Sequence, residues 1–371
     1  MSATSDKNEM RDRLVRYALT PLSWAYGTGT WIRNKLFDSG VLKEETFPIP
    51  VVSVGNLTVG GTGKTPHVEY IVDHLSRKYS MAVLSRGYKR KTKGFVLANN
   101  HSTPDMIGDE PMQIYRKYGF RTKVAVCEKR ADGIRELMRL FPDLQLILLD
   151  DAFQHRYVKP RVSILLTDYS RPFYSDNLLP LGRLRESTEQ ANRADIVVVT
   201  KCPDNLSPLD CRLVAKHLDL LSFQKLYFTR YAYSPIQPCF PDDSPYSVNL
   251  DALGTRDAAL LLTGVANPRS FVRHFRKYPF RVRVSHYPDH HDFTRRDIQE
   301  IAARFKTMKA ERKIIITTEK DAVRLAYNPY YPKELKPFTF YIPIDVEMAT
   351  VGANPSDFIP ALEELIEKKP H

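Results

Sequence analysis

Cysteine is scarce in this chain of 371 residues, which has only four. They are Cys127, Cys202, Cys211 and Cys239. No two of them stand in a C-x-x-C spacing, so a structural zinc site is not expected. Disulfide frameworks belong to small secreted domains that are rich in cysteine. The low count therefore favours a reducing, cytosolic setting.

Long hydrophobic runs are also missing. The least charged N-terminal stretch has 16 residues between Arg16 and Arg33, and it is interrupted by Pro21, Gly27 and Gly29. A membrane-spanning helix needs about 20 predominantly apolar residues. A cleavable signal peptide needs an unbroken apolar region followed by a small-x-small cleavage site, and neither is present. The sequence therefore predicts neither feature.

Acidic residues are too few to balance the basic ones. The chain has 55 Lys and Arg against 43 Asp and Glu, which gives a formal net charge of +12 and a pI near 9.4. This excess favours an anionic partner, namely a phosphorylated substrate, an acidic membrane surface or nucleic acid. Composition alone does not choose among them. The length allows a full core and two domains.

Residues 11–37 combine apolar residues at helical spacing with basic flanks and both tryptophans of the chain, Trp24 and Trp31. Basic flanks, an apolar face and aromatic residues are typical of a helix that lies in a membrane surface. The alternative is an amphipathic helix that packs on the body of the protein. The sequence leaves both interpretations open.

A phosphate-binding loop is predicted between residues 51 and 75. A β-branched run leads into a glycine-rich turn, and a segment with helical spacing follows. Glycines let backbone N–H groups turn toward phosphate oxygens at the helix N-terminus. Lys64 would reach the β- and γ-phosphates of a nucleotide, and the Thr65 hydroxyl would bind Mg²⁺. The predicted loop comprises Thr58, Val59, Gly60, Gly61, Thr62, Gly63, Lys64 and Thr65, with Thr58 where the usual pattern begins with glycine.

Beyond this loop, apolar strands alternate with helices, which predicts a mostly parallel α/β sheet covered on both faces. Strands are expected at 81–85, 123–127, 144–150, 163–168 and 194–200, and helices at 109–118 and 130–141. A proline-rich texture after residue 222 suggests a boundary near 225–233. The expected segments are a membrane-associating N-terminus (1–40), a phosphate-loop core (41–225) and a smaller α/β domain (226–371).

Ligands of parallel sheets bind at the carboxyl ends of the strands, where polar clusters occur in this sequence. Asp150 and Asp151 end the strand at 146–149 and would supply a Mg²⁺ contact, or else cap a helix. Arg86 follows the strand at 81–85 and would meet phosphate or solvent. Asp109, beside Glu110 at a predicted helix start, is either an N-cap or a general base.

His290 and His291 lie in a predicted loop and are flanked by Asp289 and Asp292. Adjacent side chains point apart on most backbones and no third ligand is evident, so a catalytic pair is favoured over a metal site. The alternative is a helix capped by Asp292 or Thr294 beside exposed histidines.

Two rival functions follow from parts of the sequence. A phosphate-loop GTPase or ATPase switch would share the loop, but such relatives often have Lys where this chain has Val59. The Thr200–Lys201 corner also lacks the following Asp that reads guanine. A nucleic-acid-binding protein is motivated only by charge, because no recognised module is present.

Taken together, the motifs resemble the tetraacyldisaccharide 4'-kinase family, whose members phosphorylate a lipid A precursor. In order along the chain they are VGNLTVGGTGKTP (54–66), SRGY (85–88), GDEP (108–111), LDD (149–151), FQH (153–155), LPLGRLRE (179–186), DH (289–290) and TEKD (318–321). Thr58 also fits this family, in which Ser or Thr commonly holds that place.

The resemblance implies transfer of the γ-phosphoryl group of ATP to the 4'-hydroxyl of an acylated glucosamine disaccharide 1-phosphate. It implies that Asp109 and His290, from different domains, form a base dyad on domain closure. Lys64 would stabilise phosphoryl charge, and Thr65 and Asp150, with Glu110, would hold Mg²⁺. Asp151 and His155 would be further site residues whose roles are left open. Arg185, Arg86 and Arg183 would meet the anionic lipid headgroup. The enzyme would sit peripherally on the cytoplasmic face of the bacterial inner membrane, with no nucleic-acid or obligate protein partner.

Overall fold

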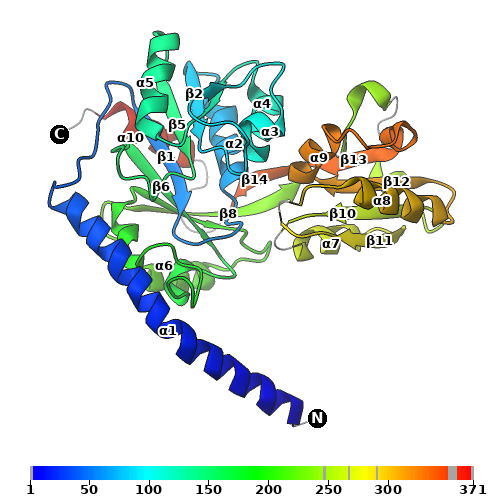
Figure 1. The fold of residues 1–371 in the computed structure, drawn as a ribbon, viewed down its shortest axis with the longest axis horizontal. Helices are drawn as coiled ribbons and strands as arrows, with labels where there is room; N and C mark the ends of the chain where they lie inside the picture. Colours follow the sequence, from blue (N-terminus) through cyan, green and yellow to red (C-terminus); the bar gives the residue numbers. More distant parts are fainter. Residues whose placement is uncertain (1–2, 245–247, 266–267, 290, 350–356, 369–371) are drawn as a thin grey trace. The chain divides into compact units, whose positions relative to one another are not determined.

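The computed structural model describes residues 3–244, 248–265, 268–289, 291–349 and 357–368, and side chains from residue 17 onward (Figure 1). Contacts group the chain into two compact units. Unit 1 comprises Met1–Arg86, Cys127–Arg230 and Val346–His371, and unit 2 comprises Gly87–Val126 and Tyr231–Asp345.

Unit 1 is built on a sheet whose strands lie in the order β14-β8-β7-β6-β1-β5-β2. The strands are β1 (Val51–Asn56), β2 (Met81–Ser85), β5 (Leu146–Asp150), β6 (Val162–Asp168), β7 (Ile196–Thr200), β8 (Lys225–Tyr233) and β14 (Ile344–Met348). The pairs β2–β5, β5–β1, β1–β6, β6–β7 and β7–β8 are all parallel. All residues of β1, β2, β5 and β7 are buried, because Val, Ile and Leu fill both faces of a covered parallel sheet.

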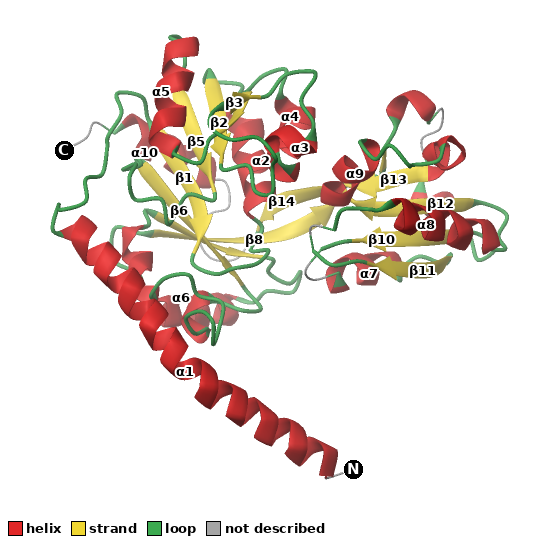
Figure 2. Cartoon of the chain, viewed as in Figure 1, coloured by secondary structure: helices red, strands yellow, loops and turns green. Residues whose placement is uncertain are grey.

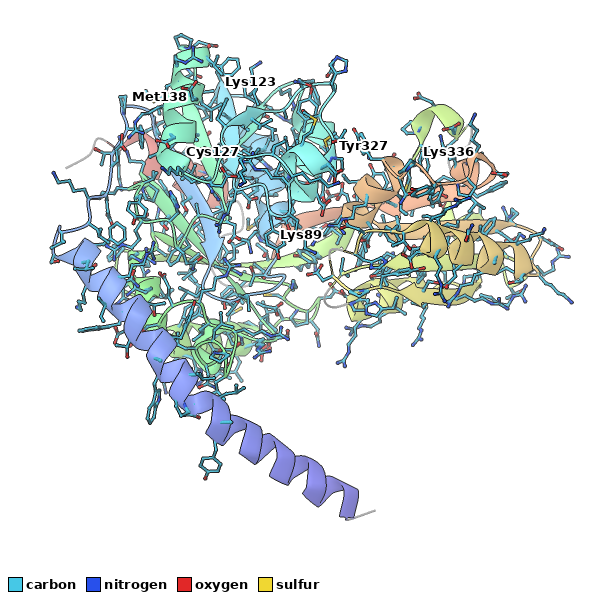
Figure 3. The ribbon with its side chains drawn as sticks, viewed as in Figure 1. Lys89, Lys123, Cys127, Met138, Tyr327 and Lys336 are labelled. Carbon is cyan, nitrogen blue, oxygen red and sulfur yellow. The ribbon has the colours of Figure 1, made fainter. Side chains whose placement is uncertain are left out.

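Helices cover this sheet (Figure 2). They are α2 (Lys64–Leu75), α5 (Arg130–Leu140), α6 (Pro208–Leu218) and α10 (Phe358–Glu367), with the short helices η1 (Phe173–Ser175) and η2 (Thr188–Arg193) in the β6–β7 connection. All four cysteines are free and buried, and Figure 3 shows Cys127 in the interior beside α5. None of the four forms a disulfide.

The N-terminal helix α1 (Ala3–Asp38) is continuous and includes Pro21. Of its aromatic residues, Tyr17, Trp24 and Trp31 are exposed at 79%, 72% and 56%, whereas Phe37 is buried at 5%. In the described part of the chain, no helix is long and apolar enough to cross a membrane.

Unit 2 has a five-stranded sheet in the order β11-β10-β12-β13-β9, parallel except for β9. The strands are β9 (Gln237–Pro238), β10 (Ala258–Thr263), β11 (Arg281–His286), β12 (Lys313–Thr318) and β13 (Thr339–Ile342). The helices are α7 (Arg269–Phe275), α8 (Arg295–Thr307) and α9 (Glu319–Ala326), with η3 (Pro241–Asp243), η4 (Leu250–Ala252) and η5 (Lys333–Phe338). One core contains Leu260 and Ile298 of α8, and another contains Leu261 and Phe271 of α7, so helices cover both faces.

Residues 87–126 complete unit 2 with α3 (Pro104–Ile107), α4 (Asp109–Tyr118) and the antiparallel pair β3 (Val96–Leu97) and β4 (Lys123–Val126). Met112 of α4 and Val323 of α9 belong to one hydrophobic cluster, which ties this insertion to the later part of the chain.

The predicted fold class is confirmed, because a mostly parallel sheet with a phosphate loop is joined by a smaller α/β unit and an N-terminal helix. The units divide the chain differently from the expected linear segments, since 87–126 groups with unit 2 and Val346–His371 with unit 1. The suggested boundary at 225–233 contains the point after Arg230 where the chain passes from unit 1 to unit 2, and this point lies within strand β8. The last helix, α10, begins at Phe358.

Candidate active site

The turn between β1 and α2 has the backbone of a phosphate loop. Gly60 and Gly63 have φ values of 112° and 90°, a region that side chains with a Cβ rarely adopt. Asn56 Nδ2 donates to Thr62 Oγ1 over 2.7 Å, and Thr200 Oγ1 donates to the carbonyl of Thr62 over 2.8 Å. The loop is therefore held from inside, and it leads into the N-terminus of α2, where unpaired N–H groups and the helix dipole favour an anion.

Lys64 stands at the centre of a charged cluster in unit 1. Its Nζ lies 3.4 Å from Asn56 Oδ1 and 3.6 Å from Asp151 Oδ1. Arg185 Nη1 lies 3.0 Å from the same Asp151 oxygen. Burial raises the pKa of Asp151, but the charges of Lys64 and Arg185 outweigh burial and lower that pKa below its usual value. Asp151 is therefore a carboxylate shared between two cations at neutral pH.

Asp150 lies at the carboxyl end of β5. In the parallel pairing it stands opposite Val54, beside the strand that enters the phosphate loop. Ser85 Oγ, at the end of β2, donates to Asp150 Oδ2 over 3.1 Å. The predicted clustering of polar groups at the ends of β2 and β5 is thus present.

The donor set fits magnesium. Thr65 and Asp150 offer oxygen atoms, the ligands that Mg²⁺ prefers, and Mg²⁺ usually takes one or two carboxylates together with phosphates and waters. Among the described residues, no group of three or more His, Cys, Asp and Glu side chains is arranged to hold a metal by itself. Glu110, the other proposed ligand, belongs to unit 2, whereas Thr65 and Asp150 belong to unit 1.

The arginine-rich connection after β6 lies along the phosphate loop. The N–H of Val59 donates to the carbonyl of Arg183 and the N–H of Arg185 donates to that of Leu57, both over 2.7 Å. These bonds bring Arg183 and Arg185 to the loop. The lysine of the Thr200–Lys201 corner also contacts the loop, because Lys201 donates to the Gly61 carbonyl and to Asp168.

His155 lies beside a buried arginine that sequence reasoning missed. Its Nε2 accepts a hydrogen bond from the N–H of Arg130 over 3.3 Å. Burial, followed by the charges of Arg130, Arg33 and Arg86, lowers the pKa of His155 to about 4, so its imidazole is neutral near pH 7. The Arg130 guanidinium donates to the backbone carbonyl of Asp150 over 3.3 Å and supports the end of β5. The burial of the Arg130 side chain points to this supporting role, whereas the local sequence gives no signal for it.

The second half of α1 is fixed to the same region. Arg33 Nη2 donates to the carbonyl of Gln154 over 2.8 Å and Arg33 Nη1 pairs with Glu186 at 3.3 Å. Tyr26 donates to the carbonyl of Arg185 over 2.9 Å. The packed-helix interpretation therefore holds for this half of α1, while other residues on the same helix remain exposed.

Asp109 is not the N-cap that one interpretation of the sequence assigned to it. The N-cap of α4 is Gly108, with φ 91°, so Asp109 is the first helical residue and not the cap. Its Oδ2 lies 2.8 Å from Nε and 2.5 Å from Nη2 of Arg324 in α9, and both side chains are only 8% exposed. Arg324 Nη1 lies 3.4 Å from Asp292 Oδ1.

His290, the expected partner of Asp109, lies outside the described residues. Its neighbours Asp289 and His291 belong to unit 2, as does Asp109, so the expected origin in two different domains does not match this division. His291 Nε2 lies 2.9 Å from Asp297, and Thr294 with Asp297 forms a capping box at the start of α8. Thr318 caps α9 in the same manner, by accepting from the N–H of Asp321.

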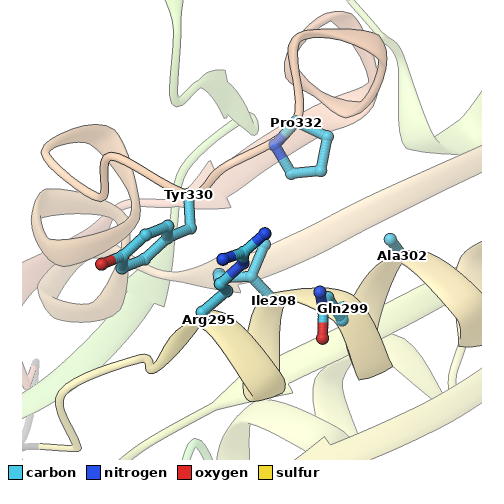
Figure 4. Close-up of a pocket in the computed structure, with 6 residues that line it drawn as sticks. All are labelled: Arg295, Ile298, Gln299, Ala302, Tyr330 and Pro332. Carbon is cyan, nitrogen blue, oxygen red and sulfur yellow. The ribbon is translucent and has the colours of Figure 1, made fainter.

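A hollow in unit 2 lies between α8 and the segment that follows α9 (Figure 4). It is lined by Arg295, Ile298, Gln299, Ala302, Tyr330 and Pro332. None of these residues was predicted as a site residue, and the polar cluster described above belongs to unit 1.

The buried β1 strand, the positive-φ glycine turn, Lys64 at the start of α2 and the acids at the end of β5 define a phosphate-loop nucleotide-binding α/β protein. Comparison with known proteins makes the class specific. The model of the family "Tetraacyldisaccharide-1-P 4'-kinase" matches residues 15–366, and the chain belongs to this family.

Its relatives agree. A tetraacyldisaccharide 4'-kinase of Bacteroides thetaiotaomicron is 49% identical over 337 residues, which cover 89% of this chain and 88% of the relative. One of Parabacteroides distasonis is 47% identical over 343 residues, covering 91% and 92%. Among solved structures, LpxK from Aquifex aeolicus in complex with ATP has a TM-score of 0.71 at 25% identity and covers 95% of this chain and 99% of its own.

Proposed function

We propose that this protein is an ATP-dependent kinase that transfers the γ-phosphate to the 4'-hydroxyl of a tetraacyl glucosamine disaccharide 1-phosphate in lipid A biosynthesis. The observation that carries the proposal is the Lys64 cluster on the phosphate loop, in a chain of the tetraacyldisaccharide 4'-kinase family. Family membership favours this function over a GTPase or ATPase switch.

Residues of unit 1 bind ATP and stabilise its charge in different ways. Residues 58–65 bind the phosphates through backbone N–H groups, and Lys64 stabilises negative charge on the transferring group. When bound, Mg²⁺ neutralises phosphate charge; Thr65 and Asp150, with Glu110, would hold it. Asp151 keeps Lys64 directed toward the loop, because their 3.6 Å ion pair fixes the ammonium group.

Unit 2 would supply the base. Asp109, with His290, accepts the proton of the 4'-hydroxyl as the phosphoryl group is transferred. Arg324 fixes the position of the Asp109 carboxylate through two donors on one oxygen. Arg185, Arg183 and Arg86 would bind the anionic headgroup of the lipid.

Access to the substrate requires a membrane surface, because acyl chains leave a bilayer at a cost of about 0.8 kcal/mol per CH₂. Tyr17, Trp24 and Trp31 are exposed on α1 at 79%, 72% and 56%, which suits insertion at the headgroup level. We place the enzyme peripherally on the cytoplasmic face of the bacterial inner membrane. Neither nucleic acid nor an obligate protein partner is part of this proposal.

Transfer of labelled phosphate from ATP to the lipid disaccharide, measured beside ATP hydrolysis, tests the function. Phosphorylated lipid supports a kinase, whereas hydrolysis without transfer would support the switch. The same assay on Asp109→Ala and on His290→Ala tests the base, with expected losses of about 10²–10⁴-fold. Near-normal rates in both variants would reject the dyad and leave the kinase proposal standing.

Trp24→Ser combined with Trp31→Ser tests the anchor without deleting α1. Deletion of residues 1–37 should also release the protein from membranes while ATP binding survives, but it removes the Arg33 contacts to Gln154 and Glu186 as well. The paired substitution spares those contacts. Unchanged sedimentation with membranes would reject α1 as the anchor.

A further inference from the structure

One stretch of unit 2 contains cations and no carboxylates. The 31 residues between Asp257 and Asp289 include five arginines and one lysine but neither Asp nor Glu. These six charges equal half of the net charge of +12. The cationic edge, as we define it, comprises Arg269, Arg273, Arg276, Lys277, Arg281 and Arg283.

The fold brings these residues to one border of the sheet. β11 is the edge strand of unit 2 and pairs only with β10. Phe271 and Phe275 of α7 pack in the same hydrophobic cluster as Val282 of β11, so helix and strand lie side by side (Figure 1). All six cationic side chains are exposed. The charges of α7 lie on one face of this border, and Arg281 and Arg283, which alternate with Val282 along β11, lie on the other face.

Most of these cations lack the carboxylate partners that some surface arginines have elsewhere. Four make no ion pair with any described residue: Arg273, Arg276, Lys277 and Arg283. Three exposed arginines in other places each face a carboxylate: Arg77 with Asp73, Arg139 with Glu136 and Arg256 with Glu311. Like charges that are gathered without counter-charges repel one another, and an anionic surface relieves that repulsion.

We infer that the cationic edge is a docking surface for an anionic lipid bilayer. The choice of a bilayer rests on the proposed function, since the acylated substrate of that reaction resides in a membrane. Nucleic acid is disfavoured because single strands need exposed aromatic rings for stacking, and Phe271, Phe275 and Phe280 are buried. This contact is separate from α1, because it belongs to unit 2 and acts through charge without apolar insertion.

A neutralised variant tests the surface. Arg273→Gln, Arg276→Gln, Lys277→Gln and Arg283→Gln are combined in the full chain, and sedimentation is measured with phosphatidylcholine vesicles with and without phosphatidylglycerol. A basic residue near an anionic surface strengthens binding by about fivefold. The variant should therefore bind anionic vesicles at least about tenfold more weakly at low salt, while binding to phosphatidylcholine alone stays unchanged.

The matched control also loses four charges, through Arg77→Gln, Arg135→Gln, Arg139→Gln and Arg256→Gln. It should lose less than about threefold, because these side chains already face carboxylates. Equal losses in both variants, or none in the edge variant, would overturn the inference. The inference would also be overturned if the edge variant bound a DNA duplex more weakly than the parent but bound anionic vesicles equally well.

Thermal unfolding and phosphate transfer to detergent-dispersed substrate separate this inference from the function. Both variants should unfold and turn over like the parent, since no edge residue is in the proposed catalytic machinery. Should the fourfold variant unfold early, the pair Arg273→Gln and Arg276→Gln on α7 is used, with a loss of at least about fivefold expected. Vesicle binding that depends on the edge in a protein without kinase activity would uphold the inference and reject the proposed function.

Discussion

Two carboxylates proposed for the site, Asp151 in unit 1 and Asp109 in unit 2, are both held by cations, yet in different ways. The Asp151 side chain is 34% exposed and shares its oxygen between Lys64 and Arg185 at 3.6 and 3.0 Å. The Asp109 side chain is 8% exposed and receives two donors from one guanidinium. The open cluster, in which Lys64 is 11% and Arg185 26% exposed, divides one carboxylate between two cations, whereas the buried pair fixes one carboxylate in place.

The buried pair should dominate stability. Arg324→Ala removes the partner of Asp109 and leaves a carboxylate buried beside the α4–α9 contact. Loss of one partner of a buried ion pair costs about 3–5 kcal/mol. Denaturant unfolding at neutral pH measures the loss. Arg256→Ala, which breaks an exposed pair with Glu311, is the control and should cost about 0–1 kcal/mol. Equal losses in the two variants would remove the distinction between buried and open pairs.

The open cluster should dominate turnover. Lys64→Ala keeps the fold but removes the charge that faces the transferring phosphoryl group. Loss of one such stabilising donor lowers kcat by about 10²–10³-fold. Steady-state phosphate transfer measures this loss of kcat. Lys78→Ala, at an exposed residue just after α2, is the control. A variant that phosphorylates the lipid at the parental rate would end the assignment of Lys64 and the phosphate-loop mechanism with it.

The contrast between the two carboxylates also marks where sequence reasoning works. Gly60, Gly63 and Lys64 follow a strand and open a helix, so their chemistry is set by neighbours along the chain and was predicted. Asp150 was found because strand ends converge in a parallel sheet. These are local patterns or simple rules of topology.

The buried pair could not be found in this way. Asp109 and Arg324 are 215 residues apart, and their contact arises from packing of α4 on α9. The same packing draws 87–126 into unit 2, which no linear division of the chain anticipates. The hydrogen bond from Asn56 to Thr62 was not predicted, because Asn and Thr are common in loops of every kind. Partners that are distant in sequence need the fold before they can be named.

Acid should lower the free energy of unfolding through His67, which lies beside the phosphate loop. His67 of α2 is buried, its Nδ1 donates to the carbonyl of Gly63, and its Nε2 lies 2.9 Å from Thr229 Oγ1. Burial, with a smaller contribution from the charge of Lys201, lowers the pKa of His67 to about 4. The folded state therefore favours neutral imidazole. Its contribution is present above the unfolded pKa of about 6.5 and is lost as pH falls toward 4.

The unfolding free energy should fall by about 1–3 kcal/mol over that interval through His67. Urea unfolding at a series of pH values measures it, and His67→Gln, which cannot titrate, should flatten the curve. A parent and a variant with the same slope between pH 6.5 and 4 would show that His67 does not carry the effect.

The smallest expected effects are on stability. They test whether the N-cap of α9 helps to position Arg324 against Asp109. Thr318→Ala removes the N-cap of α9 and should cost about 1–2 kcal/mol, as should Ser207→Ala, which removes the N-cap of α6 in unit 1. Each is combined with Arg324→Ala in a double-mutant cycle. Because Thr318 and Arg324 share one helix of eight residues, their losses should not add, with a coupling of about 0.5–1 kcal/mol.

Ser207 caps a helix of the other unit and shares no partner with Arg324, so that cycle should add to within about 0.5 kcal/mol. Coupling of the same size in both cycles would mean that the buried pair responds to general loss of stability. Coupling confined to Thr318 would mean that the cap of α9 helps to set the Arg324 guanidinium against Asp109, which is what a carboxylate held in one place requires.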